Sequence, residues 1–120
     1  SVAAGLYHMA GIASDGQLYV WGWDLRDLVS RKPKCEPGRT WRSVAVGHVA
    51  AGIDNNDQLY FWGKDDYRQV PSESALAGLT WRSVAVGSMH TAAIDNNGQL
   101  HLWGENGDKQ VTDVPAGLTW

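Results

Sequence analysis

The string TWRSVAVG occupies residues 40–47 and recurs without change at residues 80–87. A shorter copy, SVAAG, occupies residues 1–5. The dipeptide Trp-Gly recurs as well, 41 residues apart both times, as Trp21 and Gly22, Trp62 and Gly63, and Trp103 and Gly104. Self-similarity at a fixed period of about 20–50 residues is the signature of repeat architectures. The chain is therefore predicted to be a single segment, residues 1–120, made of three tandem units at about 1–40, 41–80 and 81–120.

The third unit shows most clearly what each unit is expected to form. Four short strands are predicted in it, at residues 81–87, 90–94, 99–103 and 110–114. The first and third alternate in side-chain character as half-buried strands do. Asn97-Gly98 suits a tight hairpin turn with positive φ, and Pro115 ends the outer strand. Four short strands in each unit, with no helical period, predict an all-β fold of four-stranded β-propeller blades.

Three blades are fewer than the four to eight that propellers use. The units are therefore expected to be part of a larger ring or of an oligomeric one. Further blades from the same chain or from another copy would complete it.

Composition and charge narrow the classes of partner. The net charge is −3, and the one basic cluster is Arg31-Lys32-Pro33-Lys34, so a nucleic-acid partner is not expected. No apolar run approaches the roughly 20 residues that span a bilayer, so no membrane partner is expected either. The single Cys35 favours a reducing compartment only weakly. Residues 1–5 do not resemble a signal peptide, and an upstream targeting signal stays open, so the localisation is left open.

The order of motifs within each unit is recognisable. It runs Gly-x-x-His, apolar strand, Asp/Asn-Gly turn, apolar strand, Trp-Gly, then Asn and Gln, and it resembles the repeats of the RCC1-like propeller superfamily. The third unit matches best, through Gly87, His90, Gly98, Trp103, Gly104, Asn106 and Gln110.

The other two units depart from this pattern. The second has Asp65 where Asn is expected, and the first has Asp24 and Leu28 in place of Asn and Gln. The short repeats, with Val-Pro after the Gln, are similar to those of bacterial β-lactamase inhibitor propellers. That likeness implies an architecture and no activity.

The histidines and the aspartate-rich turns are candidates for metal binding or catalysis. His8 and His90 occupy equivalent repeat positions, which favours one structural role in each blade over ligands that converge on a metal. The turns at residues 54–57 and 95–98 lack the longer loop and terminal Glu of an EF-hand, so they are interpreted as turns. No triad, phosphate-binding loop or carboxylate pair is present. Metal, cofactor and enzymatic activity are therefore not expected.

Six of the seven tryptophans recur by unit. Trp21, Trp62 and Trp103 precede Gly, whereas Trp41, Trp81 and Trp120 come before or at the start of the small-residue strand. Both sets are expected to pack within or between blades. Trp23 does not recur, because Lys64 and Glu105 occupy its position in the other units. It is therefore a candidate contact residue.

The leading functional hypothesis is a non-enzymatic RCC1-like module that binds or scaffolds a protein partner through its loop face. The residues that break the repeat are the predicted contacts: Trp23, Leu25, Arg26, Asp66, Tyr67, Arg68, Asn106, Asp108 and Lys109. One alternative is a carbohydrate-binding, lectin-like propeller. Another is a regulator of guanine-nucleotide exchange, which rests on analogy of fold alone.

Overall fold

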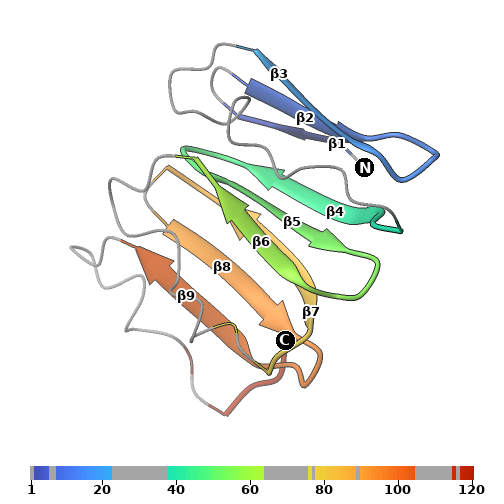
Figure 1. Cartoon of the computed structure of the whole chain (residues 1–120). Coiled ribbons are helices and arrows are strands. Elements are labelled where there is room, and N and C mark those ends of the chain that lie inside the picture. The colour runs from blue at the N-terminus through green and yellow to red at the C-terminus, as the bar shows by residue number, and fades with distance from the viewer. Residues whose placement is uncertain are drawn as a thin grey trace.

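The computed structural model of the chain describes residues 2–5, 8–22, 38–63, 76, 78–88, 90–104, 115 and 117–120. Within them, the strands form three antiparallel three-stranded sheets, each following the chain order (Figure 1). Blade 1 contains β1 (Val2–Ala4), β2 (His8–Ile12) and β3 (Leu18–Gly22). Blade 2 contains β4 (Trp41–Val46), β5 (Ala50–Asp54) and β6 (Leu59–Trp62). Blade 3 contains β7 (Trp81–Val86), β8 (His90–Asp95) and β9 (Leu100–Gly104).

The hairpin turns form where the sequence places Asx residues and glycine. In blade 3, Asp95 Oδ1 accepts hydrogen bonds from the N–H groups of Asn97 at 2.8 Å and Gln99 at 3.0 Å. Gly98 adopts a φ of 81°, a conformation that favours glycine. Blade 2 places Asp57, with a φ of 61°, at the same position. These aspartates close turns, as the sequence predicts.

The predicted outer strand at residues 110–114 lies outside the described residues, as do its counterparts in the other units. What the structure describes is three strands of each blade. In that part of the chain, no helix is long and apolar enough to cross a membrane.

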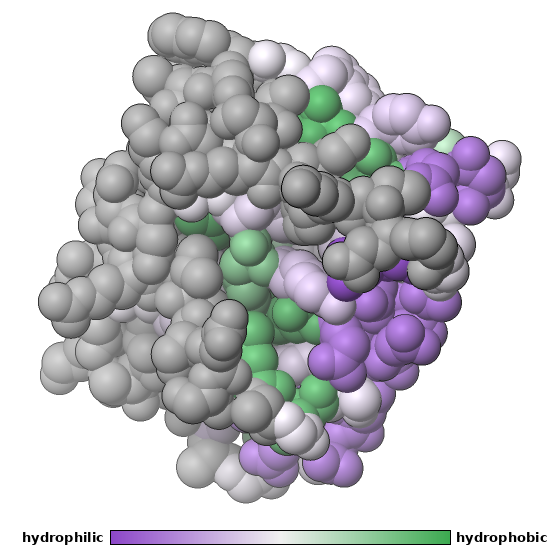
Figure 2. Space-filling view, in the orientation of Figure 1, coloured by the Kyte–Doolittle hydropathy of each residue, from purple (hydrophilic) through white to green (hydrophobic). Residues whose placement is uncertain are grey.

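The blades stack face to face, with blade 2 between the other two (Figure 1). One hydrophobic cluster fills the space between blades 1 and 2, and a second fills the space between blades 2 and 3. Hydrophilic residues gather along the edge where the β5–β6 and β8–β9 turns lie (Figure 2). Each blade is therefore buried on the face that meets a neighbour, whereas the turn edge is solvated.

The three first strands approach one another closely at their ends. A Cβ atom added to Gly47 would lie 2.5 Å from the carbonyl oxygen of Gly87. One added to Gly5 would lie 3.0 Å from Cγ1 of Val46. The glycine that ends the strand SVAVG is thus required by the next blade rather than by its own backbone conformation.

Hydrogen bonds join the start of each blade to the preceding one. The backbone N–H groups donate in three equivalent pairs: Trp41 to Gly16 at 2.8 Å, Trp81 to Asp57 at 2.9 Å and Trp120 to Gly98 at 3.0 Å. Arg42 of blade 2 donates to the carbonyl of Trp81 in blade 3 at 2.7 Å. The same guanidinium also donates to Asp57 Oδ1 within blade 2 at 2.8 Å. Arg82 donates in the same way to the carbonyl of Trp120. Trp120 therefore occupies on blade 3 the place that Trp41 and Trp81 occupy on the blades before it.

Candidate interaction surface

Side-chain alternation gives every blade two different faces. We call the face that meets the following blade the front face, and the one that meets the preceding blade the back face. In blade 2, the front face packs against blade 3 through Ala51, Ile53, Leu59 and Phe61. Its back face packs against blade 1 through Val44, Val46, Ala50 and Trp62.

The back face of blade 1 is exposed. Val2 is 70% exposed, whereas its repeat equivalent Val44 is 6% exposed. Trp21 is 48% exposed, whereas Trp62 is 6% exposed. Met9 and Tyr19 lie on the same face and are also exposed. Large apolar side chains that are buried in one unit and bare in the next indicate an unfilled contact surface.

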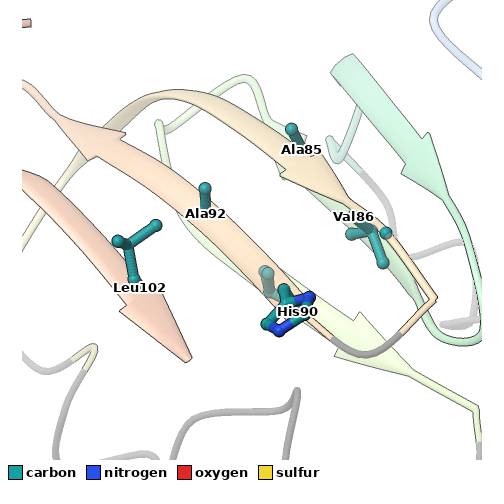
Figure 3. A pocket seen from close by; sticks show the side chains of 7 residues that line it. Ala85, Val86, His90, Ala92 and Leu102 are labelled. Carbon is teal, nitrogen blue, oxygen red and sulfur yellow. The ribbon is translucent and has the colours of Figure 1, made fainter. Parts of the chain in front are cut away.

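The front face of blade 3 carries a hollow of about 340 Å³. Figure 3 shows side chains from β7, β8 and β9 around it. The hollow is lined by Ala85, Val86, Gly87, His90, Thr91, Ala92 and Leu102. A Cβ atom on Gly87 would approach nothing closer than the carbonyl of His90 at 3.7 Å. The place that Val86 fills beside Gly47 is thus empty beside Gly87 in the described part of the chain.

A polar cluster lies at the contact between blades 2 and 3. His101 Nε2 is 3.0 Å from Asp95 Oδ2, and that carboxylate is almost fully buried. The imidazole stacks on Trp103 with an interplanar angle of 14° and meets the ring of Trp81 edge-on at 4.9 Å. Because an ionised carboxylate only accepts hydrogen bonds, Nε2–H is the donor.

In blade 2, other residues lie next to the equivalent buried aspartate, Asp54. Arg39 lies 3.8 Å from Asp54, donates to the hydroxyl of Tyr60 at 3.0 Å, and lies over the rings of Trp41 and Tyr60. In blade 3, the arginine position is held by Leu79 and the tyrosine position by His101. The substituted pair therefore keeps the buried aspartate partnered in both blades.

Acid is expected to destabilise the protein through Asp95. The hydrogen bond from His101 lowers the pKa of the Asp95 carboxyl from its usual 3.8, although burial opposes this shift. A carboxyl with a depressed folded pKa adds stability above its unfolded pKa of about 3.9 and loses it as the pH falls through the folded value. Urea unfolding from neutral pH down to about pH 2 should show this loss at the acid end.

The variant His101→Tyr, which restores the residue type of Tyr19 and Tyr60, is the matched comparison. Losing the hydrogen bond removes the main cause that lowers the pKa of Asp95. The variant should therefore lose less stability than the wild-type chain between neutral pH and about pH 2, because the acid loss comes from the difference between the folded and the unfolded pKa. An equal loss of stability in the two chains over that range would contradict this role of His101.

The nine predicted contact residues lie outside the described residues: Trp23, Leu25, Arg26, Asp66, Tyr67, Arg68, Asn106, Asp108 and Lys109. Their role in binding remains a prediction. Cys35 also lies outside the described residues. Of the two predicted structural histidines, only the side chain of His90 is described, at the edge of the hollow. Within the described ranges, no group of three or more His, Cys, Asp or Glu could hold a metal ion.

The repeated tryptophans differ in burial. Trp41, Trp62 and Trp81 are buried, Trp103 is half-buried, and Trp21 and Trp120 are exposed. Trp21 lies on the back face of blade 1 and Trp120 lies beyond blade 3, so none of the described strands of a further blade packs against either side chain. The burial of a repeated tryptophan therefore depends on whether another blade packs against its face of the sheet.

Two features of the structure were not predicted from the sequence: the contact of His101 with Asp95, and the pairing of Ala4 with Met9 on the back face of blade 1. The signal was present in the alignment of the units. His101 replaces a tyrosine found twice, and Met9 replaces the small Ala50 and Thr91. Departures within the strands carry as much information as departures in the loops.

Comparison with known proteins agrees with this geometry. The family model of the regulator of chromosome condensation (RCC1) repeat matches residues 1–26 and 81–110. No curated protein sequence gives a significant match.

Solved propeller structures resemble most of this chain. Yeast RCC1 (Prp20), solved with Kap60 bound to it, has a TM-score of 0.74 at 20% identity, over 88% of this chain and 32% of that one. Human WBSCR16 has a TM-score of 0.72 at 20% identity, over 87% and 32%. The CRINKLY WD40 ectodomain of the Arabidopsis thaliana receptor kinase ACR4 has a TM-score of 0.70 at 20% identity, over 88% and 36%. This chain thus spans about a third of the length of these proteins. The predicted all-β propeller-blade fold is confirmed.

Proposed function

Because this chain is an array of RCC1-like β-propeller repeats, we propose that it serves as a non-enzymatic module that binds or scaffolds another protein. One observation carries the proposal. The described polar side chains that recur by unit stabilise the blades themselves: Asp95 closes a turn within blade 3, and Arg42 joins blade 2 to blade 3. Recognition is therefore assigned to the segments that differ between units, which follow β3, β6 and β9.

The contact residues of this proposal are the nine non-repeating residues predicted from the sequence, with Trp23, Arg26 and Tyr67 as the strongest. Exposed aromatic and arginine side chains dominate the binding energy of protein interfaces. The solved complex of yeast RCC1 with Kap60 supports a protein as the partner class for this fold. No observation on the described residues favours the lectin-like or the nucleotide-exchange alternative.

We infer also that further blades, from the same chain or from another copy, cover the two open faces. Both faces are apolar, and equivalent faces are buried wherever two blades meet in this chain. Soluble proteins seldom leave surfaces of this kind bare.

The test of the module uses the variant Trp23→Ala/Arg26→Ala/Tyr67→Ala. The wild-type chain is immobilised, and proteins that bind to it are cross-linked to it and identified. The affinity of the captured protein for the chain is then measured by titration. The triple variant should bind that protein at least about 100-fold more weakly, because each lost anchor costs about 1–2 kcal/mol. Its thermal unfolding should match that of the wild-type chain.

The control is Asn97→Ala, an exposed residue in the β8–β9 turn on the opposite edge of the blade, which should bind normally. A glycan array and a nucleotide-exchange assay run in parallel should both be negative. Equal affinity of the triple variant and the wild-type chain would refute the assignment to the loops.

A further inference from the structure

We propose that Asn97 is a site of spontaneous deamidation, and that the isoaspartate formed there weakens the hydrogen bond between blade 3 and Trp120. The reaction needs water alone and does not depend on partner binding by the loops. The described asparagines all lie in the β5–β6 and β8–β9 turns: Asn55, Asn56, Asn96 and Asn97. Two criteria set Asn97 apart from the other three, namely a side chain that is free to react and a glycine that follows it.

The first criterion is whether the side-chain amide is already engaged in the structure. Asn55 Oδ1 accepts the N–H of Thr40 at 3.3 Å, and its Nδ2 donates to the carbonyl of Gly38 at 3.2 Å. Asn96 Nδ2 donates to Thr80 Oγ1 at 2.7 Å. Both amides would have to leave these hydrogen bonds before they could react. The side chains of Asn56 and Asn97 are exposed and make no hydrogen bond within the described part of the chain.

The second criterion separates Asn56 from Asn97. They occupy equivalent turn positions, and the backbone N–H of each donates at 2.8 Å to the aspartate two residues before it. The residues that follow them are Asp57 and Gly98, with φ values of 61° and 81°. The two turns therefore share one backbone conformation and differ in the side chain that follows the free asparagine.

A following glycine favours deamidation because it has no Cβ to hinder its own backbone nitrogen as it approaches the asparagine. The nitrogen of Gly98 gives its proton to water or hydroxide and bonds to Cγ of Asn97. The Cγ–Nδ2 bond then breaks, ammonia leaves with a proton taken from water, and a succinimide ring remains. Water opens the ring at either carbonyl carbon. One opening gives aspartate, and the other gives isoaspartate, in which the main chain runs through Cβ and Cγ.

The closed hairpin restrains this reaction. The N–H of Gly98 donates to the carbonyl of Asp95 at 3.1 Å, so the nitrogen must leave that hydrogen bond before it can attack Cγ. The β8–β9 turn lies on the hydrophilic edge of the blades (Figure 2), and exposed segments of this kind open at the least cost in free energy. Deamidation should therefore be slower in the folded chain than in the unfolded one.

The carbonyl of Gly98 joins blade 3 to the residues after it. It accepts the N–H of Trp120 at 3.0 Å, as the carbonyl of Asp57 accepts the N–H of Trp81 at 2.9 Å. Isoaspartate at position 97 adds one carbon to the main chain directly before Gly98, which displaces the carbonyl from the place that the hairpin gives it. Aspartate at position 97 adds the same charge without the extra carbon, so the two products separate the effect of charge from that of the backbone.

The first measurement follows each asparagine in the folded chain during incubation in mildly alkaline buffer. Peptide mass spectrometry detects the replacement of NH by O, and fragment ions assign it to a residue. Asn97 should react at least about 10-fold faster than Asn56, because only Asn97 precedes a residue without Cβ. A rate at Asn97 no higher than that at Asn56 would overturn the proposal.

The same incubation in urea tests the protection by the hairpin. Asn97 should react faster in urea than in the folded chain, and an equal rate would show that its hydrogen-bonded turn does not restrain the reaction. Asn106 also precedes a glycine and lies outside the described residues. In urea it should react at a rate similar to that of Asn97, since only the following glycine then matters.

A reciprocal exchange between the two turns isolates the role of the glycine. Gly98→Asp should slow the reaction at Asn97 to the rate of Asn56, and Asp57→Gly should speed the reaction at Asn56. A Cβ on Gly98 would meet nothing closer than Thr119 Cβ at 3.6 Å, and blade 2 already holds an aspartate in this backbone conformation. Unchanged rates in both variants would refute the assignment.

The last measurement concerns the join to Trp120. The isoaspartate form is purified by chromatography, and amide hydrogen exchange is followed by NMR. The amide of Trp120 should exchange at least about 10-fold faster than in the wild-type chain, whereas in Asn97→Asp it should stay within about 3-fold. The amide of Trp81 is the control in the same spectra and should not change. Equal exchange of Trp120 in the isoaspartate form and the wild-type chain would overturn the proposed weakening.

Discussion

Replacing Trp81 by alanine is expected to lower the free energy of unfolding by about 3–5 kcal/mol. Trp81 is 1% exposed and lies in the cluster that joins blades 2 and 3. Its ring meets His101 at 4.9 Å and Trp103 at 6.1 Å between centroids. Truncation leaves a cavity between two sheets whose backbones are joined by Arg42, so the space cannot collapse without breaking those hydrogen bonds.

The matched comparison is Trp120→Ala, at the same repeat position on the open side of blade 3. With 41% of its surface exposed, Trp120 should contribute less than about 1 kcal/mol to the stability of an isolated chain. Both variants are measured by urea denaturation at a concentration where the chain is monomeric. Equal losses at the two positions would mean that burial between blades is not what makes Trp81 important.

Replacing Gly47 by alanine is expected to cost about 1–3 kcal/mol, although it adds a single methyl group. The added Cβ would lie 2.5 Å from the carbonyl oxygen of Gly87 and 3.0 Å from that of Val86. Both atoms belong to the backbone of β7 or its end, so blade 3 must shift as a whole to make room. Gly47 has no positive φ, so the cost is due to packing between blades and not to backbone strain.

Gly87→Ala is the control for this variant, because Gly87 occupies the same position in blade 3. Its added Cβ meets nothing closer than 3.7 Å, so the stability of the monomer should change by less than about 0.5 kcal/mol. Thermal and urea unfolding of the two variants side by side provide the comparison. A tolerated Gly47→Ala would show that the first strands are not packed as closely as the structure has them.

Much of the fold could be predicted from the sequence because each blade is a local structure. Strand alternation and the Asn-Gly turn of the third unit are properties of neighbouring residues, and the repeat at 41 residues extended the predicted hairpins to the other two blades. Alternation also separates the two faces of a blade, with Ile53 and Leu59 on one and Trp62 on the other, whereas which face meets the following blade is known from the structure. Repeat proteins are predictable in this way because each unit contacts only its neighbours.

The site was less predictable, and particular residues show why. The predicted contacts, such as Trp23 and Tyr67, were found by where the repeat breaks, and they lie outside the described residues. His101 and Asp95 are six residues apart, and only the hairpin register places the imidazole on the carboxylate. The replacement of a repeated tyrosine by His101 is visible in the sequence, but its partner is not.

The sequence by itself determined the three repeated units, the three described strands of each blade with the turns between them, and which side chains share a face. Only the tertiary structure decided which of the repeated residues are buried. Trp62 and Trp21 occupy the same repeat position, each three residues after a Leu and directly before a Gly, yet one is 6% and the other 48% exposed. Burial depends on whether another blade lies against the face, and that is a property of the assembled ring, which no single repeat contains.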